Sequence, residues 1–181
     1  METLYNINSL VFWNEKEIRI RKFIEQSFYE DFKNILLKEN QAWKFFQIEA
    51  PSLIPAELVN PNYTKEDMFF VEKLKDEKQL VLKPETTPSS YVYAQYLLNN
   101  NMVLTPFVVW QISKSFRREQ DQVIKNMRLK EFYQQEFQCI YTRDTLNDYQ
   151  EKVLEPLKVM ISEITTSPAR VVVSDRLPSI V

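Results

Sequence analysis

Glycine and histidine are both absent from the 181-residue sequence. Without histidine the chain cannot build Ser-His-Asp or Cys-His nucleophile systems, histidine proton shuttles, or zinc sites that contain histidine. Without glycine it cannot build the G-x-G-x-x-G loop of dinucleotide-binding proteins or a P-loop, because both use glycine to bring backbone N–H groups close to phosphate. Any phosphate that this protein binds must therefore be held by side chains.

The absence of glycine is not a sampling accident. Average usage of about 7% predicts on the order of 13 glycines in a chain of this length. A strong compositional bias and deliberate design both explain the absence, and the two explanations remain open. The run Asn99–Asn101 fits the need for turns, because asparagine tolerates a left-handed backbone better than other non-glycine residues.

The sequence also has only one cysteine and a small net charge. Cys139 is the single cysteine, so no internal disulfide can form, in agreement with a reducing compartment. Lys and Arg number 23 against 25 Asp and Glu, and the net charge of -2 gives no overall attraction to nucleic acid or membranes. No stretch approaches the apolar length that spans a bilayer, and the N-terminus lacks a targeting pattern. We expect one cytoplasmic domain over residues 1–181, with no membrane partner.

A long amphipathic helix is predicted near the N-terminus. Apolar residues recur at helical spacing from Glu15 to Lys38, and Asn14 with Glu17 fits an N-cap and its N3 carboxylate. Further helices are expected over residues 88–98 and 144–164, the latter bent or interrupted near Pro156. Strands are expected within residues 43–51, 80–83, 106–119, 127–141 and 169–174.

The two longest predicted strands carry the charged stretch SKSFRREQDQVIKNMRLKEF. Because side chains alternate along a strand, antiparallel pairing would give one apolar face and one polar face. The polar face would carry Arg117, Glu119, Arg128, Phe132, Gln134 and Glu136. Guanidinium groups bind phosphate, and an aromatic ring with an arginine plane can sandwich a base. Alternation alone does not separate this nucleotide site from a solvated sheet face with cross-strand ion pairs.

Order and spacing carry a resemblance to a known family. Motif 2 of the class II aminoacyl-tRNA synthetases has the pattern F-R-x-E, a loop, R-x-R-E-F and a further Glu. This chain resembles it with FRRE at Phe116–Glu119, a loop, and RLKEFYQQEF at Arg128–Phe137. LVLKPETTPSS is similar to the L-R-P-E-T segment of the glycyl branch, and NYTKEDMFFVE is similar to the threonyl enzymes. Residues 114–141 thus resemble motif 2, and residues 23–51 resemble motif 1, a dimer-forming helix and strand ending in proline.

The resemblance implies an α+β fold, an antiparallel sheet flanked by helices, with ATP and Mg²⁺ bound. Arg117 would hold the ATP α-phosphate and the amino-acid carboxylate region, Glu119 would take the adenine amino group, and Phe132 would stack on the adenine. Arg128 would also bind the nucleotide, and Gln134 would contact the amino acid. Glu85 and Glu136 would read the α-amino group of a small amino acid, glycine by resemblance. A carboxylate at a helix N-terminus is an equally good interpretation of Glu85.

Adenylate formation suits this residue inventory. A carboxylate attacks the α-phosphorus, which requires charge stabilisation and positioning but no histidine base. No segment resembles motif 3 or an anticodon-binding domain, so we expect a core that stops before motif 3.

Three interpretations stay open: a core that binds ATP and activates glycine, a non-catalytic dimeric binding module, and a designed glycine-free core. We expect a homodimer if Phe28, Phe32, Ile35 or their neighbours on the long helix are exposed. The resemblance also allows tRNA as a partner.

Overall fold

The computed structural model of the chain describes residues 5–7, 10–72, 78–118, 129–143, 146–165 and 168–170. For residues 5–7, 146–151 and 155 it describes the backbone alone. Among the helices of this described part, none has the length and apolar character needed to cross a bilayer.

A three-stranded sheet lies at the centre of the fold, in the order β3-β7-β8. The long strands β7 (Phe107–Phe116) and β8 (Glu131–Ile140) pair antiparallel over ten residues each. The short strand β3 (Lys44–Gln47) pairs with β7 in parallel. The predicted α+β class is confirmed, but the sheet is mixed and not wholly antiparallel.

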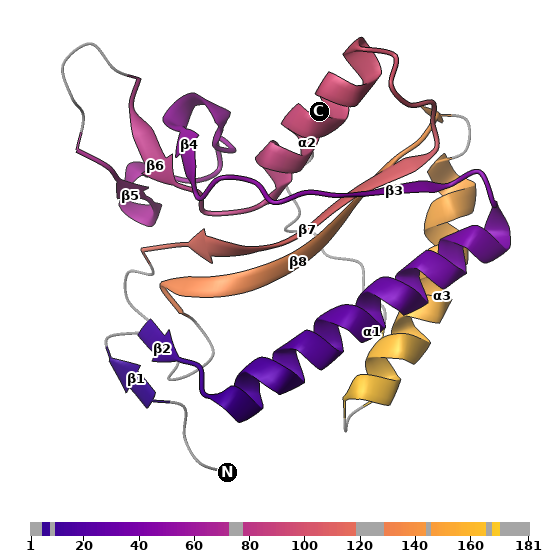
Figure 1. Cartoon of the computed structure of the whole chain (residues 1–181), viewed down its shortest axis with the longest axis horizontal. Helices are drawn as coiled ribbons and strands as arrows, with labels where there is room; N and C mark the ends of the chain where they lie inside the picture. The colour runs from indigo at the N-terminus through magenta and orange to yellow at the C-terminus, as the bar shows by residue number, and fades with distance from the viewer. Residues whose placement is uncertain are drawn as a thin grey trace.

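Helices cover both faces of this sheet (Figure 1). The helices α1 (Glu15–Glu39) and α3 (Leu146–Ile164) lie on one face, and α2 (Thr87–Asn99) lies on the other. A bend or an interruption was predicted near Pro156; helix α3 continues through this residue, so the interruption is wrong, and the bend stays a prediction. The predicted strand over residues 169–174 lies largely outside the described residues, which end at Arg170.

Short strands and short helices lie before α1 and between β3 and α2. The strand predicted over residues 80–83 is present as β6 (Leu80–Leu82). The additional described elements are β1 (Tyr5–Ile7), β2 (Leu10–Phe12), β4 (Leu53–Pro55), η1 (Ala56–Leu58), η2 (Lys65–Asp67), β5 (Phe69–Phe70) and β6 (Leu80–Leu82). Strand β6 pairs antiparallel with both β4 and β5.

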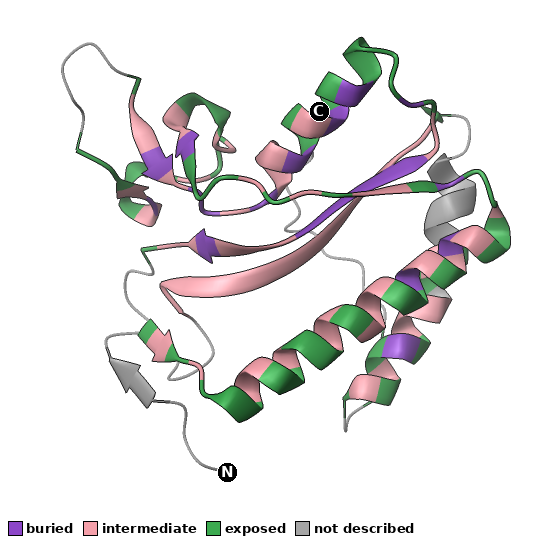
Figure 2. Cartoon of the chain, in the orientation of Figure 1, coloured by how far each residue is buried: buried purple, intermediate pink, exposed green. Residues whose placement is uncertain are grey.

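The alternation along β7 divides the core into two layers. Val108 and Trp110 pack against α1, whereas Phe107 and Val109 pack against α2. Each of these four side chains is buried, and Figure 2 shows β7 as the most buried strand. Trp110 stacks on Tyr29 of α1 with ring centroids 4.3 Å apart. The antiparallel hairpin predicted from alternation is confirmed.

Helix α1 begins as its sequence predicts. The Asn14 side chain accepts a hydrogen bond from the Glu17 backbone N at 3.1 Å, and the Asn14 backbone N donates to Glu17 Oε2 at 2.8 Å. This capping box satisfies two N–H groups at the helix terminus. Farther along, Phe32 and Leu36 are buried, and the Phe32 ring lies 4.6 Å from that of Phe137 on β8.

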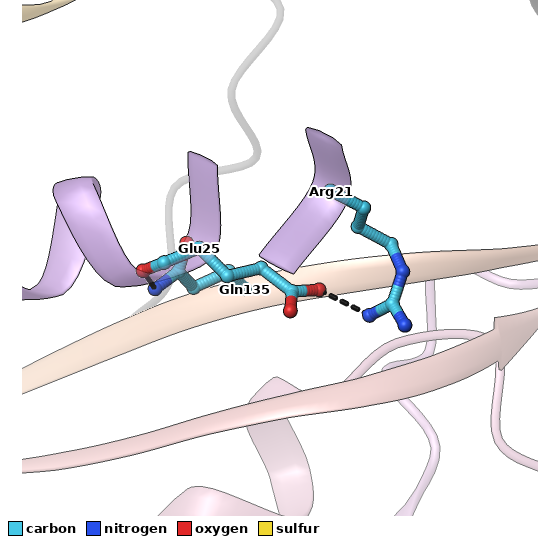
Figure 3. A network of polar contacts seen from close by, with 3 residues as sticks. All are labelled: Arg21, Glu25 and Gln135. Carbon is cyan, nitrogen blue, oxygen red and sulfur yellow. Dashed lines mark hydrogen bonds and ion pairs between the residues drawn. The ribbon is translucent and has the colours of Figure 1, made fainter. Parts of the chain in front are cut away.

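Polar contacts also attach α1 to the underside of β8 (Figure 3). Gln135 donates from Nε2 to the backbone oxygen of Glu25 at 2.7 Å, and the Glu25 carboxylate pairs with Arg21. The Arg21 guanidinium lies 3.9 Å from the centre of the Tyr133 ring. These contacts hold β8 on the face of the sheet that α1 covers. The side chains between them along β8 point toward the opposite face.

The turn after α2 shows how the chain manages without glycine. Asn101 has a φ of 52°, in the left-handed region that glycine ordinarily occupies. The prediction that the asparagine run would supply this conformation is confirmed.

Candidate functional site

The polar face of the β7–β8 hairpin forms the floor of the candidate site. In the register of the pair, Gln111 lies opposite Glu136, Ser113 opposite Gln134, and Ser115 opposite Phe132. The Ser115 hydroxyl donates to Gln134 Oε1 across the strands. Beside this floor runs the segment that leads from β6 into α2, and it includes Lys83, Glu85 and Thr86.

Glu136 is held in place by three donors. The hydroxyl groups of Thr86 and Thr87, at the start of α2, donate to its two carboxylate oxygens. Gln138 donates from Nε2 to Glu136 Oε1 at 2.6 Å. These three bonds fix the orientation of the Glu136 carboxylate on the sheet floor.

Gln111, opposite Glu136 in the strand pair, adds a second fixed group. Its side chain is completely buried, and its Nε2 donates to Thr86 O at 3.0 Å and to Ser90 Oγ at 2.8 Å. These two bonds fasten the first turn of α2 to β7. Its Oε1 is buried without a hydrogen-bond partner among the described residues.

Glu85 lies in an environment that opposes its ionisation. Burial raises its pKa, the charge of Glu136 raises it further, and Arg117 partly offsets both. Its Oε1 is buried and lacks a hydrogen-bond partner within the described part of the chain. The pKa of Tyr91 on α2 is raised by burial and then by the charges of Glu136 and Glu85. A bound cation would relieve this repulsion, because it stabilises both carboxylates.

Arg117 lies at the end of β7, beside the carboxylates. Its Nε donates to the backbone oxygen of Pro84 at 2.9 Å. The guanidinium carbon is 5.2 Å from the centre of the Phe132 ring and 5.3 Å from that of Tyr63. The planar guanidinium can bind two oxygens of a phosphate or a carboxylate at once, so Arg117 suits an anion of either kind.

Lys83 supports the floor from the side. It is completely buried, and its Nζ donates to Ala50 O at 3.0 Å and to Ser113 Oγ at 2.7 Å. Burial lowers its pKa, an effect that nearby Glu49 partly opposes. Its backbone oxygen accepts from Phe116 N at 2.9 Å, so Lys83 joins β7 to the segment before α2.

Cys139 takes no part in this chemistry. Burial raises the pKa of its thiol to about 12, so the thiol stays protonated and unreactive near neutral pH. Among the described residues, no cluster of three or more acidic or cysteine side chains could hold a metal ion.

The structure brings together most of the residues singled out from the sequence. Arg117, Phe132, Gln134 and Glu136 lie on one face of the hairpin, and Glu85 faces them from the segment before α2. Glu119 and Arg128 lie outside the described residues.

Sequence reasoning missed Tyr63, Lys83 and Gln111 as members of the site. Tyr63 comes from an irregular loop, which has no periodicity to indicate where a side chain points. A lysine at the end of a short strand is ordinarily read as exposed. Gln111 could have been found, because it belongs to the same alternating set as Arg117.

The architecture and the site define the class of protein. Residues 69–178 match the family described as the tRNA synthetase class II core domain (G, H, P, S and T). The chain belongs to this family. None of the curated proteins compared with the chain matches it by sequence.

Solved structures with the same fold include several synthetases. A histidine–tRNA ligase subunit from Alicyclobacillus acidocaldarius is similar with a TM-score of 0.64 and 13% identity over 91% of this chain and 43% of that one. Prolyl-tRNA synthetase from Giardia lamblia, in complex with prolyl-adenylate, gives a TM-score of 0.60 and 19% identity over 88% of this chain and 32% of that one.

A third similar structure, from Bacillus halodurans, is described as an ATP phosphoribosyltransferase regulatory subunit/histidyl-tRNA synthetase. Its TM-score is 0.63, with 17% identity over 90% of this chain and 38% of that one. The chain therefore spans less than half the length of each of these three proteins. These likenesses support the fold.

The Glu85 environment generates a prediction about stability. The raised pKa means that the folded chain binds more protons than the unfolded chain between the usual glutamate pKa and the raised value. The parent therefore loses stability as pH rises through this window. Glu85→Gln does not titrate there, so its free energy of unfolding should exceed that of the parent by an amount that grows with pH.

Denaturant unfolding near pH 4 and near pH 7 measures this difference. The exposed Glu72→Gln is the matched control and should give no such gain. A Glu85→Gln variant that is less stable than the parent near pH 7 would contradict the prediction.

Proposed function

We propose that this chain forms the adenylate-forming core of a class II aminoacyl-tRNA synthetase, with glycine as the amino acid. The observation that carries the proposal is the placement of an arginine, an aromatic ring and two carboxylates around one sheet face. We propose that residues 1–181 form a single domain of this kind. A cytoplasmic location and binding of tRNA remain predictions.

The nucleotide half of the proposed site is built on Arg117 and Phe132. The Arg117 guanidinium would neutralise charge on the α-phosphate as the amino acid carboxylate attacks and pyrophosphate leaves. The Phe132 ring would stack on the adenine. In this proposal Glu119 accepts from the adenine amino group and Arg128 also contacts the nucleotide, as the family resemblance implies for both.

The amino acid half is built on Glu136 and Glu85. An α-ammonium group between them would supply the positive charge that the raised pKa of Glu85 indicates is lacking. Gln134 would contact the amino acid from the same face. The choice of glycine rests on the P-E-T segment and on the second carboxylate, which together resemble the glycyl branch.

Mg²⁺ would enter with ATP. It prefers phosphate oxygens and water with only one or two carboxylates, so a dedicated protein cage is not required. In this proposal Glu85 and Glu136 serve the α-ammonium group, so phosphate oxygens and water would hold the ion. When bound, the ion would share the negative charge of the phosphates.

ATP–pyrophosphate exchange across the amino acids tests the proposed reaction and its substrate together. We expect exchange with glycine and much weaker exchange with alanine or serine. Arg117→Ala should lower the rate by about 100-fold or more, because it removes a charge that stabilises the transition state. The exposed Arg19→Ala is a matched control that should keep the parent rate. Exchange that is absent for every amino acid would contradict this reaction.

Calorimetry with ATP and Mg²⁺ tests binding separately from chemistry. The parent should bind MgATP, and Arg117→Ala should bind it several-fold or more weakly, because charge-assisted hydrogen bonds to phosphate are lost. Identical, negligible heats in both proteins would remove the nucleotide site. Arg19→Ala again serves as the control.

A non-catalytic binding module is the second candidate. The similar structure described as a regulatory subunit/histidyl-tRNA synthetase favours it, because that description connects this fold with a regulatory role. Retained MgATP binding without exchange for any amino acid would support this candidate over the first.

We also propose a homodimer through the first half of α1. Phe32 is buried and Phe28 and Ile35 are half-buried, whereas Ile20 and Phe23, more than two helical turns before Phe32, are 50% and 70% exposed. Two apolar side chains one turn apart on an open helix face suit helix–helix contact.

Sedimentation at micromolar concentration tests the dimer. The parent should sediment as a dimer, and Phe23→Ser should shift it toward monomer because the apolar contact is lost. Leu104→Ser, at a residue that is 83% exposed and lies beyond α2, is the control. A parent that is only monomeric would end this proposal.

A further inference from the structure

The Arg117 guanidinium contacts a second aromatic ring that comes from a distant part of the chain. Tyr63 precedes η2, and the centre of its ring lies 5.3 Å from the guanidinium carbon. Phe132 on β8 lies at a similar distance of 5.2 Å. Two rings and the Pro84 carbonyl thus surround one side chain. Cation–ring attraction at these distances is favourable and strengthens as water is excluded.

The loop that carries Tyr63 is held firmly at both ends. Before it, Asn60 accepts at its backbone oxygen from Tyr63 N, and at Oδ1 from Asn62 N, both at 3.0 Å. After it, Thr64 and Asp67 form a capping box, with Thr64 N donating to Asp67 Oδ2 at 2.9 Å. These bonds set the direction in which the Tyr63 side chain leaves the loop.

The same loop is tied to the strand that carries Arg117. Arg118, the next residue, donates from its backbone N to Asp67 O at 2.9 Å. The Tyr63 side chain also packs against the buried cluster of Ile54, Met68 and Val81. Tyr63 therefore meets Arg117 as part of a built contact between the small sheet β4-β6-β5 and the end of β7.

We propose that Tyr63 is a positioning residue that holds the Arg117 guanidinium for an incoming phosphate group. This inference rests on the proposed nucleotide site and deepens it. An arginine side chain loses considerable rotamer freedom when it is fixed, so contacts made before the ligand arrives lower the cost of binding. Tyr63 acts through Arg117, whereas Phe132 serves the base.

The separate roles of Tyr63 and Phe132 can be distinguished by the ligands that each one affects. Loss of Tyr63 should weaken ligands that carry phosphate and should leave adenosine binding unchanged. Tyr63→Phe keeps the ring face and should restore the contact, because the attraction arises from the ring and not from the hydroxyl group.

Calorimetry with MgATP, tripolyphosphate and adenosine tests the assignment. Tyr63→Ala should weaken MgATP and tripolyphosphate by about tenfold, while Tyr63→Phe stays within about twofold of the parent. Adenosine should bind all three proteins alike. In the Arg117→Ala background, Tyr63→Ala should have no further effect, since its action passes through that guanidinium.

Val59→Ala is the matched control, because Val59 packs against the same buried cluster but has no aromatic ring to face a guanidinium. It should bind MgATP as the parent does. Equal weakening of adenosine and MgATP by Tyr63→Ala, or an undiminished effect in the Arg117→Ala background, would overturn the positioning role. A parent that binds no MgATP would overturn the nucleotide site itself, and the positioning role with it.

Discussion

The antiparallel pairing of β7 with β8 is the constraint on which both the core and the site depend. Its register puts Trp110 opposite Phe137 on one face and Gln111 opposite Glu136 on the other. Side chains alternate with a period of two, so a slip of one residue would exchange the two faces. The aromatic contacts beneath α1 disfavour such a slip, because they would be lost. The packing of the apolar face therefore also fixes the geometry of the polar face.

The polar face contains groups that the fold alone does not satisfy. Glu85 and Gln111 each leave a buried Oε1 without a partner among the described residues, and burial, together with the charge of Glu136, raises the pKa of Glu85. Buried polar atoms are ordinarily paired, and an unpaired one costs about 1–3 kcal/mol. Such unsatisfied acceptors at one sheet face are typical of a site that awaits a ligand with donors.

The sequence predicted what has a regular period and missed what has none. The α1 helix, its capping box at Asn14, and the hairpin all follow from local patterns, and the structure reproduces them. The parallel pairing of β3 with β7 joins segments that lie far apart in the sequence. The four residues of β3 carry too short a pattern to indicate which strand they pair with. Tyr63 and Lys83 were missed for the same reason, because their surroundings are assembled from segments distant in sequence. For Arg117 and Phe132, alternation predicted a shared face, but not the contacts that hold the arginine.

The contacts around Arg117 also bear on the absence of glycine from the sequence. A glycine-rich loop offers phosphate a set of backbone N–H groups that are already fixed in place. A protein without glycine must use side chains, and a free arginine is flexible, so it has to be ordered by its surroundings. Here a carbonyl at Pro84 and the rings of Phe132 and Tyr63 surround one guanidinium. In the proposed nucleotide site, packing around Arg117 would supply the pre-organisation that other folds obtain from the backbone.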